Sequence, residues 1–319
     1  MTRARFQAGF RRNRICLGVA LVCAALIRPA QDCVGSRSGD AGQDPDLLYF
    51  SSPAAVKRMA LGYDCLAADF YWMRTIQYYG RRDEADRRAV RYKNLSTLLD
   101  ITTTLNPDLM DAYRSGSLFL SEPDPIGAGQ PLGAVKLLDK GIAAHPKEWR
   151  LPYDKGFIYF WFLKDYKAAG ESWLAASRLP EAPPWMEGLA AMALSKGGAM
   201  DVAISLWKRQ LEESDRANIR ENARNHLLSI RVARNIWTME ILLDQYSRRY
   251  GSLPASLKEL ARGLGRSLPL IDPLGTPYVY DPETGEVKLS PESKVRYLEV
   301  PESLKEELRM TMGEEFKRR

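Results

Sequence analysis

Residues 146–180 read PKEWRLPYDKGFIYFWFLKDYKAAGESWLAASRLP, and this stretch decides the fold. Pro146 and Pro180 lie 34 residues apart, and each is expected to follow a helix because proline cannot continue one. Between them, apolar and small residues recur every three or four positions, which is typical of amphipathic helices. Asp165 and Tyr166 interrupt this pattern and predict a turn. The stretch therefore predicts two helices that form one unit of a repeat.

The two helices carry small residues where they must cross. Tyr153, Gly156 and Tyr159 lie on the first helix, and Gly156 lets the second helix approach because it has no side chain. On the second helix, residues three and four apart share one face. That face carries two alanines and one large ring: Ala169, Ala176 and Trp173. We expect the alanines to lie at the crossing and the tryptophan to fill the space between repeats.

The same order of small and large residues recurs on both sides of this unit. The upstream copy has a longer turn at residues 122–130 and contains Ala112, Gly116, Phe119, Ala134, Leu138, Gly141 and Pro146. The downstream copy contains Ala191, Leu194, Ala203 and Trp207. A more divergent copy begins the series with residues 66–79, a charged loop at residues 81–88, Leu95, Leu99 and Pro107. A fixed period of this length predicts an array of helix pairs.

In these positions residues 56–215 resemble the tetratricopeptide repeat (TPR) family, as about four repeats. The resemblance implies an all-α fold in which residues 53–215 form a TPR-like α-solenoid of about four helix pairs. The turns vary in length, and the Trp-Leu-Gly signature of the family is never complete. An unrelated α-helical bundle is the alternative.

The inner helices of TPR proteins line a concave groove that holds a partner. In the clearest repeat of this chain, the resemblance assigns four residues of the first helix to such a groove: Arg150, Tyr153, Phe157 and Phe160. Aromatic and arginine side chains are enriched at recognition surfaces, so these four are candidates for binding another protein. For Tyr153 and Phe157 the alternative is ordinary packing between repeats.

A long helical segment follows the repeats. Residues 216–250 contain no proline or glycine, and apolar residues such as Ile219, Ala223 and Leu227 recur at spacings of three and four. This pattern predicts a capping helix or helix pair that covers the open end of the array.

The composition changes at Gly251, where a small α+β appendage is expected over residues 251–291. Ser256 and Glu259 form a capping box for a short helix at residues 257–263. Residues 278–280 and 287–289 then predict the two strands of a β-hairpin. The charged tail at residues 292–319 predicts either an amphipathic helix or a disordered segment.

The appendage is similar to the C-terminal part of type II secretion pseudopilins. The similarity rests on a Gly-x-x-Pro entry at Gly251 and Pro254, on the turn at residues 272–275 and on the hairpin. In some pilin-like proteins this region holds calcium. That similarity implies candidate oxygen ligands at Asp272, Asp281 and Glu283, with a solvated turn as the alternative.

The N-terminal residues 1–33 have the order of a secretory signal. A basic region precedes an uncharged run at residues 15–27, which Arg28 closes. A membrane-spanning helix needs about 20 apolar residues, so this run is short for a permanent span. We expect a signal peptide or, if it is not cleaved, an N-terminal membrane anchor, followed by a polar linker at residues 34–52. Packing of the run inside a soluble fold is the alternative.

The net charge of +6 does not indicate a nucleic-acid surface. Residues 1–33 contain a single acid, Asp32, and six arginines: Arg3, Arg5, Arg11, Arg12, Arg14 and Arg28. They carry +5 of the total, which leaves about +1 for residues 34–319. Binding to phosphates requires basic charge on a folded surface. We therefore expect no nucleic-acid partner.

No combination of residues indicates an active site or a metal site. Cys65 is expected to be a free, buried thiol, and His145 and His226 are interpreted as helix-end or surface residues. No phosphate-binding loop or Gly-x-Ser-x-Gly elbow occurs. The four cysteines form no Cys-x-x-Cys pair: Cys16, Cys23, Cys33 and Cys65. The sequence predicts a protein without enzymatic activity, cofactor or metal.

The leader, the repeats and the pilin-like end together predict a protein-binding scaffold of the cell envelope, in the periplasm or on the periplasmic side of the inner membrane. Its expected partners are other proteins of a secretion, pilus or polysaccharide-export complex, and the inner membrane itself if the leader is not cleaved. A cytoplasmic or membrane-associated TPR adaptor is the first alternative, and a repeat-assisted envelope enzyme is the second.

Overall fold

The computed structural model describes residues 52–80, 92–124, 126–302 and 304–310, and residues 25, 28 and 29 singly. The chain divides into two units, Met1–Ser51 and Ser52–Arg319, and nearly all described residues belong to the second. Most of the expected leader, most of the linker and the charged loop at residues 81–88 therefore lie outside the described residues. No helix in the described part of the chain is both long enough and apolar enough to cross a membrane.

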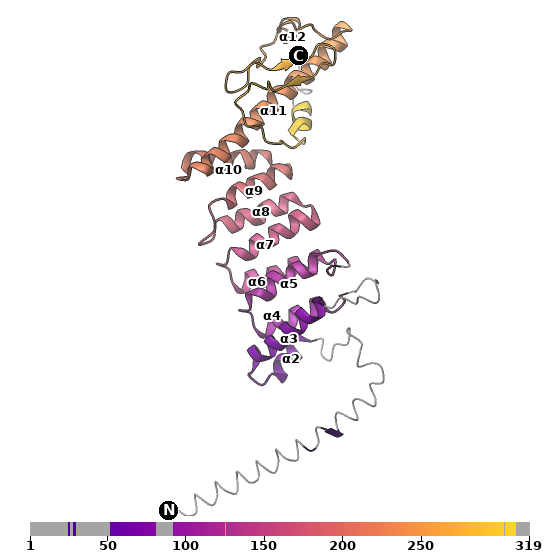
Figure 1. The fold of residues 1–319 in the computed structure, drawn as a ribbon, viewed down its shortest axis with the longest axis vertical. Helices are drawn as coiled ribbons and strands as arrows, with labels where there is room; N and C mark the ends of the chain where they lie inside the picture. Colours follow the sequence, from indigo (N-terminus) through magenta and orange to yellow (C-terminus); the bar gives the residue numbers. More distant parts are fainter. Residues whose placement is uncertain are drawn as a thin grey trace, which may run out of the picture. The chain divides into compact units, whose positions relative to one another are not determined.

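The second unit is mostly helical (Figure 1). Its helices are α2 (Pro53–Met59), α3 (Asp64–Gly80), α4 (Leu95–Leu105), α5 (Met110–Ser121), α6 (Pro131–Ala144), α7 (Arg150–Ile158), η2 (Tyr159–Leu163), α8 (Tyr166–Ser177), α9 (Met186–Lys196), α10 (Met200–Glu213), α11 (Ala217–Tyr250) and α12 (Leu257–Leu264). The strands β1 (Val279–Tyr280) and β2 (Val287–Lys288) pair antiparallel, with Val279 opposite Lys288. This architecture agrees with the expected all-α class, and the predicted hairpin is confirmed.

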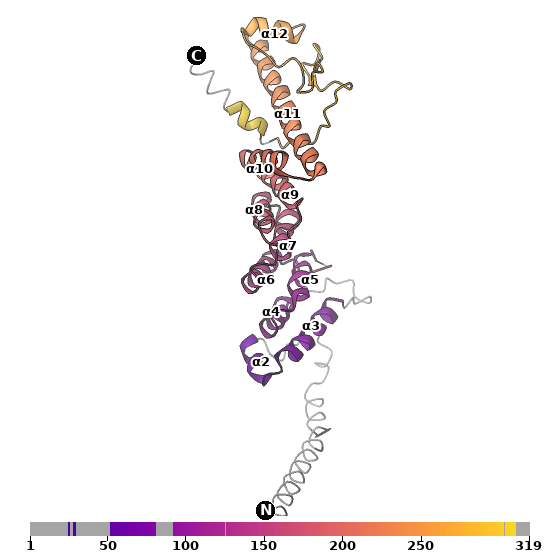
Figure 2. The same cartoon turned by 90° about the vertical axis from the view of Figure 1, so that its left-hand side faces the viewer.

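The helices pack mainly against their neighbours in the sequence. α3 contacts α4, α5 contacts α6 and α7 contacts α8, and contacts continue from α8 through α9 and α10 to α11. Figures 1 and 2 show α3 to α10 following one another in chain order. Buried apolar residues accordingly form a series of clusters along the helices.

Gly156 of α7 lies directly against Trp173 of α8. A Cβ atom at this position would overlap the indole ring of Trp173, which is only 3% exposed. The indole Nε1 of Trp173 donates a hydrogen bond to the carbonyl oxygen of Tyr153 at 2.9 Å and so fixes the ring between the helices. The expected role of Gly156 in letting the helices approach is therefore confirmed.

The turn between α7 and α8 differs in detail from the expectation. α7 continues into the π-helical turn η2, and Lys164 then adopts a left-handed conformation with φ of 56°. Asp165 caps α8, because its carboxylate accepts a hydrogen bond from the Ala168 N–H at 2.9 Å. The turn thus lies at Lys164 and Asp165, and Tyr166 already belongs to α8. Spacing of apolar residues at three and four cannot distinguish a final π-helical turn from an α-helical one.

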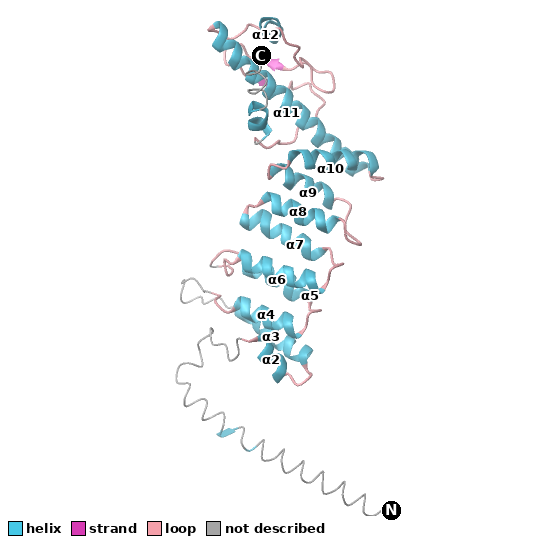
Figure 3. Cartoon of the chain, turned by 180° about the vertical axis from the view of Figure 1, so that it is seen from behind, coloured by secondary structure: helices cyan, strands magenta, loops and turns pink. Residues whose placement is uncertain are grey.

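α11 is one continuous helix that ends at Tyr250, and Gly251 caps it with a left-handed φ of 75°. Its C-terminal half packs against α12 and the hairpin through buried residues that include Met239, Leu243, Leu260 and Tyr278. Figure 3 shows the two strands in magenta near the end of this helix.

The capping box of α12 is present with a small change. Ser256 accepts a hydrogen bond from the Glu259 N–H at 3.3 Å. The Glu259 carboxylate accepts one from the Ala255 N–H at 2.8 Å, one residue earlier than the motif requires. The predicted start of this helix is therefore confirmed.

Asp272 organises the turn that the pseudopilin similarity proposed for calcium. Its buried carboxylate accepts hydrogen bonds from the Leu274 N–H at 2.8 Å, the Thr276 N–H at 3.0 Å and the Ser293 hydroxyl at 2.5 Å. Desolvation alone would raise the pKa of Asp272, but these hydrogen bonds together lower it below its ordinary value.

The other two candidate ligands do not join Asp272 in a metal site. Asp281 accepts hydrogen bonds from the Glu283 N–H at 2.9 Å and from the Thr284 hydroxyl at 2.8 Å. The described residues contain no group of three or more His, Cys, Asp or Glu side chains that could hold a metal ion. The carboxylates of Asp272 and Asp281 therefore bind backbone N–H and hydroxyl groups of nearby residues.

The segment after the hairpin returns to the helices. The N–H of Leu298 donates to the Ser229 hydroxyl at 2.8 Å, and Lys305 pairs with Glu240 of α11 at 2.8 Å. Val300 and Leu304 are buried in the same cluster as Trp207. Residues 304–310 are helical, whereas residue 303 and residues 311–319 of the charged tail lie outside the described residues. This segment thus connects the appendage back to α9, α10 and α11.

Cys65 is exposed, so the expectation of a buried thiol is wrong. It lies in the first turn of α3, and the buried residues of this helix begin one turn later, at Ala68. Neighbouring apolar side chains of α3 are also exposed, among them Leu66, Phe70 and Met73.

Candidate functional site

α7 and the π-helical turn η2 carry the four residues that the TPR resemblance assigned to a groove, with Phe160 in η2, and all four are partly exposed. Tyr153 and Phe160 also pack against the buried cluster around Trp173, whereas Arg150 and Phe157 do not belong to that cluster. Phe157 lies 6.2 Å from the ring of Trp161, measured between ring centres. Packing between helices therefore accounts for part of Tyr153 and Phe160, and Arg150 and Phe157 lie outside the cluster around Trp173.

Arg150 is oriented by two neighbours. It pairs with Glu148 at 2.8 Å, and its guanidinium lies 4.9 Å from the centre of the Trp149 ring. One turn further along α7, the carboxylate of Asp154 pairs with Arg114 of α5 at 2.6 Å. Burial nevertheless raises the pKa of Asp154 more than the pair with Arg114 lowers it. The charges on this side of α7 are thus held by ion pairs with preceding segments.

Two exposed tryptophans extend the aromatic residues of α7. Trp161 is 54% exposed and lies 5.3 Å from Phe160, and Trp185 is 48% exposed and lies edge-on to Tyr153 at 6.0 Å. Ring contacts through Trp173 connect Tyr153 with Phe160. We call this contact-linked set the aromatic surface: Arg150, Tyr153, Phe157, Phe160, Trp161 and Trp185.

The repeat pattern of the sequence did not indicate either exposed tryptophan. Trp161 lies in the π-helical turn, and Trp185 lies directly before α9, outside the repeat pattern that guided the assignment. Exposed tryptophan is uncommon and is enriched in binding hot spots. The high number of aromatic residues in this stretch was therefore the sequence feature that could have indicated these two residues.

A cavity of about 390 Å³ opens beside Trp185, between α9, α10 and α11. Exposed Asn218 and Asn222 of α11 and buried Gln210 of α10 supply its amide groups. We call it the amide cavity, and its lining residues are Trp185, Gly188, Leu189, Met192, Gln210, Asn218, Ile219, Asn222 and His226. It adjoins the aromatic surface, because Trp185 belongs to both.

Gln210 is the unusual residue of the amide cavity. It is 4% exposed, and neither atom of its amide has a hydrogen-bond partner among the described residues. The amide end lies beside Gly188, since a Cβ built there would be 3.1 Å from Oε1 and 3.6 Å from Nε2. Gln210 also lines a neighbouring cavity of about 280 Å³, which Gly188 does not line. The amide therefore lies against Gly188 in the wall of the amide cavity.

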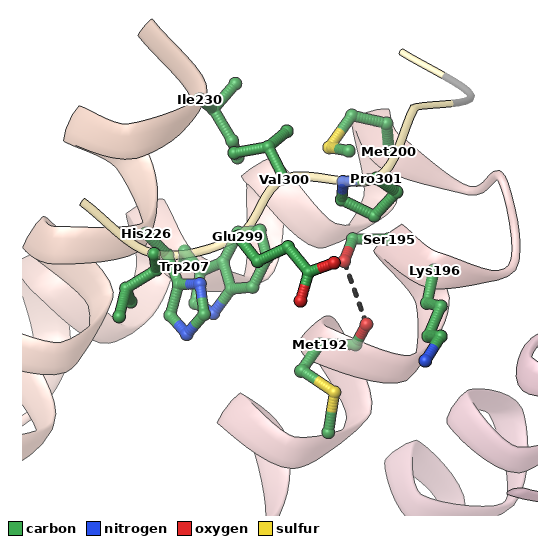
Figure 4. A pocket seen from close by; sticks show the side chains of 11 residues that line it. Met192, Ser195, Lys196, Met200, Trp207, His226, Ile230, Glu299, Val300 and Pro301 are labelled. Atoms are coloured by element: carbon green, nitrogen blue, oxygen red, sulfur yellow. Dashed lines mark hydrogen bonds between the residues drawn. The ribbon is translucent and has the colours of Figure 1, made fainter. Parts of the chain in front are cut away.

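His226 separates the amide cavity from a second cavity of about 280 Å³ and lines both. Its ring stacks on Trp207 with 4.3 Å between ring centres and an interplanar angle of 8° (Figure 4). The returning C-terminal segment covers this second cavity with Leu298, Glu299 and Val300. The indole Nε1 of Trp207 is buried and has no partner within the described residues.

The two histidines thus differ from each other. His145 follows α6 directly and its Nε2 lies 2.8 Å from the Pro107 carbonyl oxygen, so the expectation of a helix end is confirmed. For His226 the expectation is wrong, because it lies inside α11 and is partly buried against Trp207. Nothing in the spacing of α11 marked its tenth residue as facing the aromatic ring of another helix.

Burial lowers the pKa of His226 from 6.5 to about 4, so the ring is neutral near pH 7. Between these two values the unfolded chain binds more protons than the folded chain, and stability falls as the pH decreases from 6.5 to 4. We expect this residue to contribute about 2 kcal/mol to that fall, after allowance for its partial exposure.

The measurement is urea unfolding of the natural chain and of His226→Phe at several pH values between 7 and 4. Phenylalanine keeps a ring against Trp207, and the carboxylates that titrate in both proteins cancel in the difference. An identical pH dependence of the two proteins would contradict the assignment.

The site offers aromatic faces, amide groups and paired charges, which suit the binding of another molecule. Comparison with protein-family models, with curated proteins and with solved structures finds no match for this chain.

Proposed function

We propose that this protein is a non-enzymatic scaffold of the cell envelope that binds other proteins through its aromatic surface. The observation that carries the proposal is the exposure of Trp161 and Trp185 at either end of a contact-linked aromatic set. Tryptophan and arginine are enriched among the hot spots of protein interfaces, and tryptophan buries a large area at small entropic cost. Their exposure in a single chain favours a partner that covers them.

The proposed scaffold is a TPR-like α-solenoid. Its support is the 34-residue spacing of Pro146 and Pro180, together with the packing of each helix against its sequence neighbours. Gly156, the small residue expected where two repeat helices cross, meets the Trp173 ring there. In such an array the stability comes from successive helix pairs, and one continuous side remains available for a partner.

The envelope location rests on the basic, apolar order of residues 1–33 and on the similarity of residues 251–291 to pseudopilins. The proposed partners are proteins of a secretion, pilus or polysaccharide-export complex. The inner membrane is a further partner if the leader is retained. A reporter enzyme that is active only after export, fused after residue 40, tests this location. Activity confined to the cytoplasm would instead favour an adaptor on the cytoplasmic side.

The binding role is tested by the double variant Arg150→Ala and Phe157→Ala. Both side chains are partly exposed and lie outside the buried cluster around Trp173, so the helical content should be unchanged. We expect the variant to lose at least nine-tenths of the cross-linked partner recovered from membrane extracts. Circular dichroism verifies the fold, and Lys147→Ala, an exposed change before α7, is the control. Undiminished capture by the double variant would reject the aromatic surface as the binding site.

A further inference from the structure

We infer that the amide cavity binds a carboxamide group of a peptide segment, which enters between α9, α10 and α11 and hydrogen-bonds to Gln210. This inference rests on the proposed protein-binding function and specifies the chemistry of one part of the contact. It starts from a buried polar side chain whose donor and acceptor are both free within the described residues.

The first argument is the state of Gln210 itself. A buried amide that lacks partners destabilises a folded protein, because it has lost its hydrogen bonds to water. Replacement by an apolar residue of similar size would remove that penalty. An unpartnered amide that is only 4% exposed is therefore expected where a ligand supplies the missing donor and acceptor.

The second argument is the composition of the lining. The amide of Gln210 presents one acceptor and two donors, and a carboxamide presents the complementary pair. Asn218 and Asn222, which are exposed, add further groups that can both donate and accept. Among the described residues, no Asp, Glu, Lys or Arg lines the amide cavity, and burial keeps His226 neutral near pH 7. These features favour a neutral, polar ligand group over an ionic one.

The third argument is position. Trp185 lies at the amide cavity and also contacts Tyr153 of the aromatic surface, so one peptide can contact both. Gly188 provides the space, since any side chain there would lie against the amide of Gln210. The carboxamide could come from an asparagine or glutamine side chain or from the peptide backbone, and the experiment below separates these sources.

The test begins with a library of random twelve-residue peptides, selected for binding to the full chain in detergent. Affinities of the retained peptides are measured for the natural chain, Gln210→Leu and Gly188→Ala. Gln130→Leu is the matched control, because Gln130 is exposed and its side chain makes no capping hydrogen bond. Thermal unfolding of each variant is recorded in parallel.

We expect Gln210→Leu to weaken peptide binding at least tenfold. Loss of each hydrogen bond to a buried group raises the dissociation constant by a factor that approaches ten. Its thermal stability should be unchanged or higher, because an unpartnered buried amide has been removed. Gly188→Ala should also weaken binding, and Gln130→Leu should leave it unchanged. If Gln210 had a purely structural role, its replacement would lower the thermal stability and leave the affinity for peptides unchanged.

Modified peptides then identify the source of the carboxamide. Replacing each asparagine or glutamine by leucine should abolish binding if a side chain enters the cavity. Replacing single backbone amides by esters should abolish it if the backbone does. Either result supports the inference, provided that the same peptide modification does not change the affinity of the Gln210→Leu variant.

Peptides that bind the natural chain and Gln210→Leu equally would overturn the inference, as would failure of the library to yield any binder. The proposed function would survive the first result if Arg150→Ala with Phe157→Ala still abolished capture. It would fail separately if that double variant retained full capture.

Discussion

Replacing Gly156 by alanine is expected to lower the free energy of unfolding by about 3 kcal/mol. The added methyl group would overlap the ring of Trp173, which is almost fully buried and cannot move outward. Displacing the ring also breaks its hydrogen bond to the Tyr153 carbonyl. Alanine gains about 1 kcal/mol over glycine from helix propensity, and that gain is too small to offset the overlap.

Chemical denaturation followed by tryptophan fluorescence and circular dichroism measures this effect. The matched control is Gly133→Ala in α6, where the nearest atom to the new Cβ would be the Cβ of Gln130 at 3.6 Å. That variant should be slightly more stable than the natural chain. A double variant with Trp173→Leu should cost less than the sum of the two single changes. Equal stability of Gly156→Ala and the natural chain would contradict the close approach of α7 and α8.

Replacing Asp272 by alanine is expected to cost about 3 kcal/mol, mainly within the appendage. The change leaves the N–H groups of Leu274 and Thr276 and the hydroxyl of Ser293 without their acceptor. It also removes the hydrogen bond to Ser293 that connects the turn with the segment leading back to the helices. Because the pKa of Asp272 is lowered by folding, its contribution is complete above its ordinary value of 3.8 and is lost as the pH falls below it.

Hydrogen exchange of the Leu274 and Thr276 amides measures the local loss, with added calcium as an independent variable. Asp281→Ala is the control, because that carboxylate is exposed and serves only the hairpin loop. Calcium should not change the exchange rates if hydrogen bonds alone organise the turn. Unaltered protection in Asp272→Ala would show that another group fixes the turn.

Local features of this fold could be predicted from the sequence. Pro146 and Pro180 identified helix ends, Gly156 identified a helix crossing, and Ser256 with Glu259 identified the start of α12. Each of these depends on residues that are close in sequence or on the backbone properties of one residue type. The same is true of the hairpin, whose turn residues and alternating side chains are consecutive.

The candidate site could be predicted only in part, because it depends on contacts between distant segments. Arg150 and Phe157 were selected through the repeat pattern, but the amide cavity exists only where α9, α10 and α11 meet. Whether Gln210 lacks a partner, and whether His226 meets Trp207, depends on the rotation of each helix about its own axis. Periodicity restricts that rotation to a broad face of the helix. It does not fix which polar residue at the edge of that face becomes buried.

The return of the C-terminal segment to α9, α10 and α11 gives the two ends of the second unit different mechanical properties. α3 and α4 are secured through contacts with adjacent segments, so they can separate without disturbing remote parts of the chain. Val300 and Leu304 of the C-terminal segment pack in the same cluster as Trp207 of α10. The appendage, α11 and α10 are therefore linked to one another by contacts between residues distant in sequence. Segments joined in this way are expected to unfold together as one cooperative unit. The amide cavity should therefore keep its shape while α3 and α4 unfold locally.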